Sequence, residues 1–264
     1  MVDKKDDKSA GQKLQDTLCL QNKDLGTIDA DLLQKALPYA EDYKLFLRNK
    51  TEREIVDYTL PIVKKFGYKE FKLGTRYKPG DKVFYNNRGK NLILVTMGEK
   101  PVADGVRISV AHIDSPRLDF KPSPLFEADE MAYFKTHYYG GIKKYQWTAI
   151  PLSLHGVLVL NNGKTVKVRL GEEPGEPQFC VTDLLPHLAR EQMTKPMNKA
   201  IDAEQLNVLV GCWPFKDDKA SQKVKLNILD MLFKKYGIIE KDFLSAELCA
   251  CPAFTPTDLG LDRS

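Results

Sequence analysis

Long apolar runs are missing from this sequence. The apolar stretches at residues 92–95 and 157–160 have only four residues each, whereas a transmembrane helix needs about 20 apolar residues in a row. Residues 1 to 15 are polar and charged, and they lack the apolar centre of a secretory signal. We therefore expect no membrane among the partners of this protein.

A strong excess of one charge is missing as well. The 264 residues include 40 Lys and Arg against 36 Asp and Glu, a net charge of +4. The basic pairs Lys64-Lys65 and Lys234-Lys235 are typical of solvated faces with charges of mixed sign. Because the sequence has no clustered basic stripe with interleaved aromatic residues, we expect no nucleic-acid partner.

Cysteine is scarce, and the cysteine spacings of a zinc site and of a redox site are absent. The five cysteines are odd in number, and Cys249-Ala250-Cys251 has the spacing of neither a zinc site nor a redox CxxC site. We interpret this pair as packing on a strand and expect a reducing, cytoplasmic location. Ser245 lacks the Gly-x-Ser-x-Gly context of a hydrolase nucleophile, which argues against a serine hydrolase.

Histidine is rare too, yet one of the four histidines has a suggestive neighbour. Residues 105–110 are rich in β-branched side chains and predict a strand, which Pro116 stops from continuing inside a sheet. His112 and Asp114 are two residues apart, so on a strand they point to the same face. The imidazole can then bind a metal ion through one nitrogen while the carboxylate orients the ring through the other. A buried, purely structural His–Asp pair is the alternative interpretation.

The region before this pair predicts helices followed by sheet. Residues 1 to about 25 look like a frayed polar leader, and residues 41–49 show helical spacing of apolar side chains. Thr51-x-x-Glu54 is a capping box at the start of a second helix, which Gly67 ends. Further strands are predicted at residues 82–85 and 91–97, joined by a turn at Asn87-Arg88-Gly89.

The region after Pro116 has short alternating strands and little helical periodicity. Strands are predicted at residues 131–135, 149–152, 156–160 and 165–170. A helix follows, with Ser221 as its N-cap and Gly237 as its C-terminal stop. Residues 243–251 then predict a strand that returns to the first sheet.

Several longer motifs point to a known family. They are His112-Ile113-Asp114-Ser115-Pro116, Thr136-His137-Tyr138-Tyr139-Gly140-Gly141, Lys143-Lys144-Tyr145-Gln146-Trp147, Ala203-Glu204-Gln205-Leu206-Asn207 and Asp242-Phe243-Leu244-Ser245-Ala246-Glu247. From about residue 41 to residue 264 the chain resembles the M18 family of metalloaminopeptidases, which includes aspartyl aminopeptidase. The resemblance covers somewhat more than the first half of a family member.

The resemblance implies an α/β fold class. A zinc-peptidase-like catalytic domain, incomplete here, is interrupted by an inserted β-rich dimerisation domain. We place the amino-terminal part of the catalytic domain at residues 1–118, the inserted oligomerisation domain at 119–241 and the re-entry at 242–264. The inserted domain is expected to form a homo-oligomer, because it has more large aromatic side chains than a small domain can bury: Tyr133, Phe134, Tyr138, Tyr139, Tyr145 and Trp147. We expect residues 120–241 to fold and dimerise alone.

The resemblance also implies the roles of three residues. His112 is expected to ligate one of two zinc ions, and Asp114 to orient its ring; other divalent ions could replace zinc. His187 matches a family position from which a histidine of the β-rich domain reaches the active site of a neighbouring subunit; a surface-loop histidine is the alternative. The other metal ligands and the general-base Glu of the family follow beyond a segment such as residues 257–264.

The remaining candidates have structural interpretations. His137 lies between aromatic residues, and His155 lies at the start of a strand, so we interpret both as structural. In the family pattern Glu247, Asp258 and Asp262 precede the bridging Asp, and they are not expected to replace it.

Two functions from different classes follow from this sequence. The first is a zinc-dependent aminopeptidase that removes amino-terminal residues from peptides, of which this chain lacks most metal ligands and the general base. The second is a catalytically inactive, truncated module for assembly or interaction. For the chain alone we expect no aminopeptidase activity, weak zinc binding and partly exposed apolar faces at residues 106–110 and 243–251.

Overall fold

The computed structural model describes residues 8–20, 30–261 and 263. The chain falls into two compact units, residues 1–45 and residues 46–264. The described α-helices are α1 (Ala10–Leu18), α2 (Ala30–Leu47), α3 (Glu52–Lys65), α4 (Arg190–Thr194) and α5 (Lys223–Tyr236). The described 3-10 helices are η2 (Val102–Asp104), η3 (Lys144–Trp147), η4 (Met197–Lys199), η5 (Ala203–Gln205) and η6 (Glu240–Ser245). None of the described helices combines the length and the apolar character that crossing a bilayer requires.

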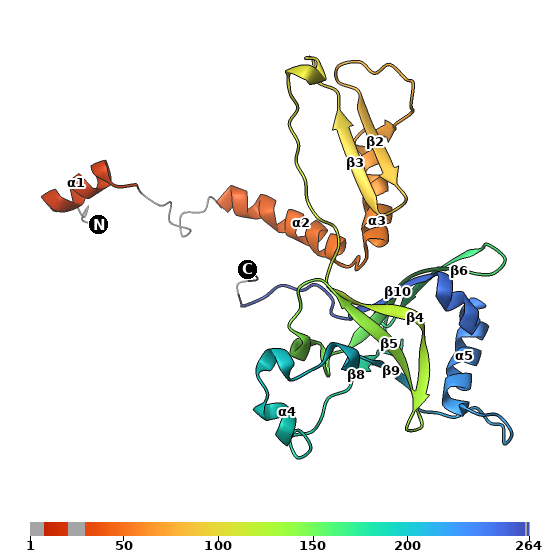
Figure 1. Cartoon of the computed structure of the whole chain (residues 1–264). Coiled ribbons are helices and arrows are strands. Elements are labelled where there is room, and N and C mark those ends of the chain that lie inside the picture. The colour runs from red at the N-terminus through yellow and green to blue at the C-terminus, as the bar shows by residue number, and fades with distance from the viewer. Residues whose placement is uncertain (1–7, 21–29, 262, 264) are drawn as a thin grey trace. The chain divides into compact units, whose positions relative to one another are not determined.

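The described strands form two sheets (Figure 1). A three-stranded sheet has the order β1 (Lys69–Glu70), β2 (Lys82–Asn87), β3 (Asn91–Thr96). A seven-stranded sheet has the order β7-β6-β10-β4-β5-β9-β8. Its strands are β4 (Arg117–Ala128), β5 (Met131–Tyr139), β6 (Leu152–Val159), β7 (Thr165–Leu170), β8 (Cys180–Val181), β9 (Val208–Gly211) and β10 (Ala246–Pro252).

The amino-terminal region is more helical than its polar composition suggests. Ser9 caps α1, because its hydroxyl accepts a hydrogen bond from the Gln12 N–H and the Gln12 side chain accepts one from the Ser9 N–H. The expected frayed leader is therefore wrong for residues 10–18, whereas residues 1–7 and 21–25 lie outside the described residues.

Two local predictions in the first sheet region are confirmed. Thr51 and Glu54 form the predicted capping box at the start of α3, which ends beside Gly67 in the left-handed region at φ 84°. Arg88 and Gly89 both have positive φ, at 59° and 70°, and close the β2–β3 hairpin. Two successive left-handed residues are the signature of a hairpin turn whose twist matches that of its strands.

Strand β10 occupies a place that its position in the chain does not suggest. It lies between β6 and β4 and pairs antiparallel with both, as Figure 1 shows. The seven-stranded sheet therefore extends past the boundary predicted at residue 241, and a segment that stops there would lack a central strand. The division of the chain into domains otherwise stays a prediction.

Burial differs between the two apolar faces that were expected to be exposed. Val106, Ile108 and Val110 are 60, 77 and 86% exposed, which confirms the first expectation. Phe243 and residues 248–251 are buried, so the second expectation is wrong for them, whereas Leu244 in the same stretch is 64% exposed. The physical reason is that β10 has a neighbouring strand on each side and contributes to the core of the seven-stranded sheet.

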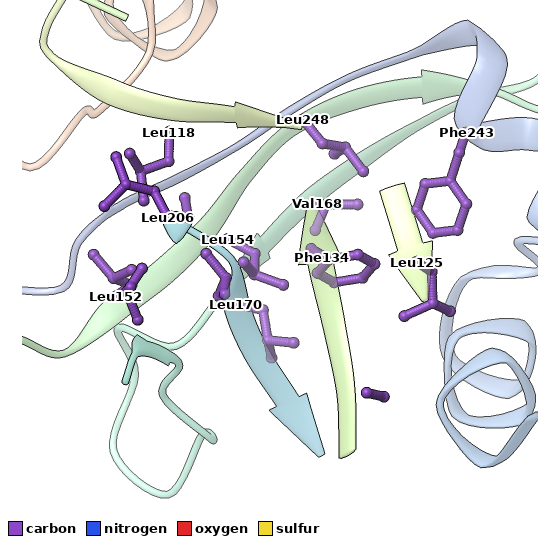
Figure 2. Close-up of a cluster of buried hydrophobic side chains, with 14 of the residues drawn as sticks. Leu118, Leu125, Phe134, Leu152, Leu154, Val168, Leu170, Leu206, Phe243 and Leu248 are labelled. Carbon is purple, nitrogen blue, oxygen red and sulfur yellow. The ribbon is translucent and has the colours of Figure 1, made fainter. Parts of the chain in front are cut away.

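The main core is formed by side chains of the seven-stranded sheet and of the segments that cover it. Phe134 packs edge-on against Phe243, and both lie near Leu125 and Leu248 (Figure 2). Trp147 and Phe134 are buried. The expectation that the aromatic residues crowd an exposed surface is therefore wrong for these two, because the core accommodates them.

Helix α5 contacts β4, β5 and β9 and contributes Val224 to the same core. Its N-cap residue is Gln222, in the left-handed conformation at φ 49°, not the predicted Ser221. Its C-cap is Gly237, as predicted. Strand β6 contains most of the strand predicted at residues 156–160, whereas the strand predicted at 149–152 is wrong, because only Leu152 of it belongs to β6.

Candidate functional site

The segment that carries His112 has no regular secondary structure. Residues 105–116 lie between η2 and β4 without pairing to either sheet, so the strand predicted at 105–110 is wrong for this chain. β-branched residues favour extended backbone, but a strand also needs a neighbour for its hydrogen bonds. The described residues supply no such neighbour, and the His112 side chain is 84% exposed.

His112 and Asp114 nevertheless contact each other, although they lie outside any strand. Nδ1 of His112 lies 3.0 Å from the main-chain oxygen of Asp114 and 3.3 Å from its Oδ1. Two oxygen acceptors at one nitrogen require a proton on Nδ1, which in a neutral ring selects the tautomer that is protonated there. That tautomer has its lone pair on Nε2, which is the nitrogen available to a metal ion.

The other carboxylate oxygen of Asp114 is also engaged. The hydroxyl of Tyr139, the last residue of β5, donates a hydrogen bond of 2.8 Å to Oδ2 of Asp114. This hydrogen bond lowers the pKa of Asp114, with a smaller contribution from His112. The same bond raises the pKa of Tyr139. Asp114 is therefore a carboxylate held between a phenol and an imidazole.

Arg117 connects this group to the body of the fold. Its guanidinium lies 4.1 Å from the centre of the Tyr139 ring, and the two residues are partners in the β4–β5 register. Its Nε donates to Asp119 at 2.7 Å and its Nη1 donates to Glu52 of α3 at 2.9 Å. Burial alone would lower the pKa of Arg117, but these carboxylates outweigh it and raise the pKa.

The described residues do not complete a metal centre. In the described part of the chain, no three His, Cys, Asp or Glu side chains come together in a group that could hold a metal ion. His112 and Asp114 provide one imidazole and the carboxylate that orients it, and a zinc site needs three or four ligands. The residues present therefore do not fit a zinc site on their own.

His187 lies on an exposed loop between β8 and α4, away from any interaction with the pair. Across residues 30–261, no hydrogen bond or ion pair joins His187 to His112 or Asp114. A cavity of about 770 Å³ opens beside this loop, and Leu184 and Leu188 on either side of His187 line it. The structure places His187 at the rim of a hollow surface without bringing it to the candidate site.

A second polar cluster was not foreseen as a cluster. His155 of β6 is completely buried, with Nδ1 at 2.8 Å from Oε1 of Glu54 and Nε2 at 2.9 Å from the Ser153 hydroxyl. Glu172 lies 3.4 Å from Nε2 and accepts a 2.8 Å hydrogen bond from Arg169. The only sequence signal was a histidine inside an apolar strand.

The charges of this cluster stabilise one another. Burial alone would lower the pKa of His155, but hydrogen bonds to Glu172 and Glu54 outweigh it and raise the pKa to about 9. Burial alone would raise the pKa of Glu172, but His155 and Arg169 lower it to about 2. The cluster is thus an imidazolium between two carboxylates, which supports the structural interpretation of His155.

The other polar candidates have structural contacts. His137 is exposed and stacks on Tyr138, with ring centres 5.4 Å apart. Glu247 accepts a 2.8 Å hydrogen bond from Arg53 and forms an ion pair with Lys90. Asp258 accepts a 2.6 Å bond from Arg263, and Asp262 lies outside the described residues.

Comparisons with known proteins agree with these observations. The sequence model of the family described as aminopeptidase I zinc metalloprotease (M18) matches residues 45–264. A protein of Clostridium acetobutylicum named probable M18 family aminopeptidase 1 is 47% identical over 241 residues, which are 89% of this chain and 52% of that protein. The chain spans about half the length of the curated relatives it matches.

Solved structures show the same fold. The crystal structure of an M18 aminopeptidase from Thermotoga maritima matches with a TM-score of 0.85 at 37% identity, over 93% of this chain and 53% of that chain. A structure described as a yeast mApe1 dodecamer matches with a TM-score of 0.60 at 18% identity, over 85% of this chain and 50% of that chain. These matches confirm the predicted α/β fold class.

Proposed function

Because the chain belongs to the M18 family of zinc metallopeptidases, we propose that it supplies one part of an aminopeptidase that removes amino-terminal residues from peptides. The observation that carries this proposal is the contact between His112 and Asp114. Both residues occupy the positions at which the family motif has a zinc ligand and its orienting carboxylate. The geometry leaves Nε2 of His112 with its lone pair, as a ligand requires.

The rest of the metal centre is proposed to come from outside the described residues. One imidazole does not hold zinc, and the described part of this chain offers no cluster of further ligands. The relatives are about twice as long as the matched region, so their unmatched part is the natural source of the missing ligands and of the base. Two zinc ions and peptide substrates are proposed for the completed enzyme.

Assembly with a second copy of the chain is proposed for the loop around His187. Large apolar side chains are exposed there and along the helices that follow it: Leu184, Leu185, Leu188, Met193 and Met197. An exposed apolar patch of this kind is typical of association sites. The yeast relative of the same fold is described as a dodecamer. In such an assembly His187 would contribute to the site of a neighbouring subunit.

The test uses this chain co-expressed with the unmatched part of the Clostridium acetobutylicum relative. His112→Ala is expected to abolish activity and to lower bound zinc. Asp114→Asn is expected to leave the fold intact and to lower zinc affinity or rate by roughly 10–100-fold, because outer-shell partners contribute about that much. His137→Ala, at an exposed histidine that stacks on Tyr138, is the control. Full activity of either site variant would refute the assignment.

An inactive assembly module is the second candidate function. The absence of a metal-ligand group among the described residues and the apolar loop at 184–197 favour it. The two functions differ in one result, since a module would assemble but would not gain activity when the missing part is supplied. A cytoplasmic location stays a prediction for both.

A further inference from the structure

Tyr139 is the link between the seven-stranded sheet and the His112 segment. It is the last residue of β5, while Asp114 lies three residues before β4 begins at Arg117. Because Arg117 and Tyr139 are register partners, the end of β5 lies beside the residues that lead into β4. The Tyr139 hydroxyl can therefore reach Oδ2 of Asp114, at 2.8 Å.

The segment that carries His112 needs such a link, because its main chain lacks the hydrogen bonds of a sheet. Residues 105–116 have no regular secondary structure, and the His112 ring is largely exposed. The ring orientation then depends on the two Asp114 oxygens at its Nδ1, the main-chain oxygen and Oδ1 of the carboxylate. One oxygen of that carboxylate faces His112 and the other faces Tyr139. The hydrogen bond from the Tyr139 hydroxyl therefore restricts the orientation of the Asp114 side chain.

Tyr139 itself is held through its ring. The Arg117 guanidinium lies over its ring, and Arg117 is fixed by hydrogen bonds to Asp119 and Glu52. Stacking of guanidinium on an aromatic face restricts the ring without involving its hydroxyl. The hydroxyl is therefore presented to Asp114 from a rigid support.

We propose that Tyr139 is a positioning residue that fixes the Asp114 carboxylate and, through it, the tautomer and orientation of the His112 ring. As a site for catalysis this rests on the proposed function, but the positioning itself is a property of the chain alone. Tyr139 touches neither substrate nor reacting atoms in this role. It acts through Asp114, which is the residue that orients the His112 ring.

The direct test is the tautomer of His112 in the 264-residue chain, measured by long-range proton–nitrogen NMR with labelled histidine at about pH 8.5, where an ordinary imidazole is neutral. His112→Gln identifies the signal. The wild-type ring is expected to carry its proton on Nδ1. Tyr139→Phe keeps the ring under Arg117 but removes the hydroxyl, and it is expected to give a mixture of both tautomers, as Asp114→Asn should. Tyr138→Phe, which removes a hydroxyl from the adjacent residue, is the matched control.

The results separate this proposal from the proposed function. A Tyr139→Phe spectrum identical to that of the wild type would refute the positioning role, whether or not the completed enzyme is active. In the completed enzyme, Tyr139→Phe is expected to lower kcat roughly 10-fold with KM nearly unchanged. A changed tautomer together with an inactive completed wild-type enzyme would refute the proposed function and leave the positioning role intact.

Discussion

Two histidines of this chain lie in opposite environments, one exposed and one buried. His112 is exposed and paired with one carboxylate, whereas His155 is buried between Glu54 and Glu172. Glu54 makes two contacts with its carboxylate. Its Oε2 accepts a hydrogen bond from the Thr51 N–H at the start of α3, and its Oε1 accepts one from His155. The imidazolium therefore ties α3 to β6 and to the loop after β7. Removing one member of a buried ion pair leaves an unpaired charge, which is costly.

The pH dependence of stability tests the charged state of His155. Its pKa is raised from 6.5 in the unfolded chain to about 9 in the fold. The resulting stabilisation is complete below about pH 6.5 and is lost as the pH rises through about 9. We predict that the unfolding free energy of the wild type, relative to His155→Gln, falls by about 3 kcal/mol between pH 6 and pH 10 in urea titrations.

The exposed His137 provides the control for that experiment. His137→Gln, which removes an exposed histidine that stacks on Tyr138, is measured in parallel over the same pH range. A pH-independent difference for His155→Gln would show that the pKa of the buried ring does not change on folding.

At the scale of elements, the predictions from sequence succeeded where the signal was local. The Thr51–Glu54 capping box and the Arg88-Gly89 turn involve residues within a few positions of one another. The contact between His112 and Asp114 is present, but the strand from which their shared face was predicted is not. The place of β10 between β4 and β6 was not, because it depends on pairing with residues about 90 to 130 positions earlier. The contacts that Tyr139 and Arg117 make near His112 were not predicted, for the same reason.

The strand predicted at residues 105–110 failed for a related reason. β-propensity describes how well a side chain packs on a neighbouring strand, so it carries little information when the neighbour is not there. The exposed apolar side chains of this segment and of β3, Ile93 among them, are consistent with a sheet that further strands would extend.

Gly156 provides a test of the β6–β10 pairing. It faces Leu248 across the two strands at φ 132°, and a Cβ added there would lie 2.0 Å from the main-chain oxygen of Glu247. We predict that Gly156→Ala lowers the unfolding free energy by roughly 2–5 kcal/mol, from backbone strain and from the forced separation of the strands. Gly98→Ala, whose Cβ would meet no atom within 4 Å, should stay within about 0.5 kcal/mol of the wild type. Equal stability of the two variants would contradict the observed register.

Across the whole molecule, the chain has the His112–Asp114 pair and, separately, an exposed apolar loop at residues 184–197. The apolar residues of the 184–197 loop are exposed in the single chain. We predict that the chain is at least dimeric at micromolar concentration in light scattering, and that Leu185→Glu with Leu188→Glu makes it monomeric. Leu73→Glu, at another exposed apolar residue, is the control. A wild-type chain that is a uniform monomer would contradict this prediction.

We propose that His112 and Asp114 form an incomplete peptidase site, which needs further metal ligands from outside the described residues. The most direct measurement is hydrolysis of aminoacyl substrates, with zinc added, by the chain alone and by the chain co-expressed with the unmatched part of the Clostridium acetobutylicum relative. We predict no turnover by the chain alone, metal-dependent turnover by the pair, and none by a pair that carries His112→Ala. Metal-dependent turnover by the purified chain alone would contradict it.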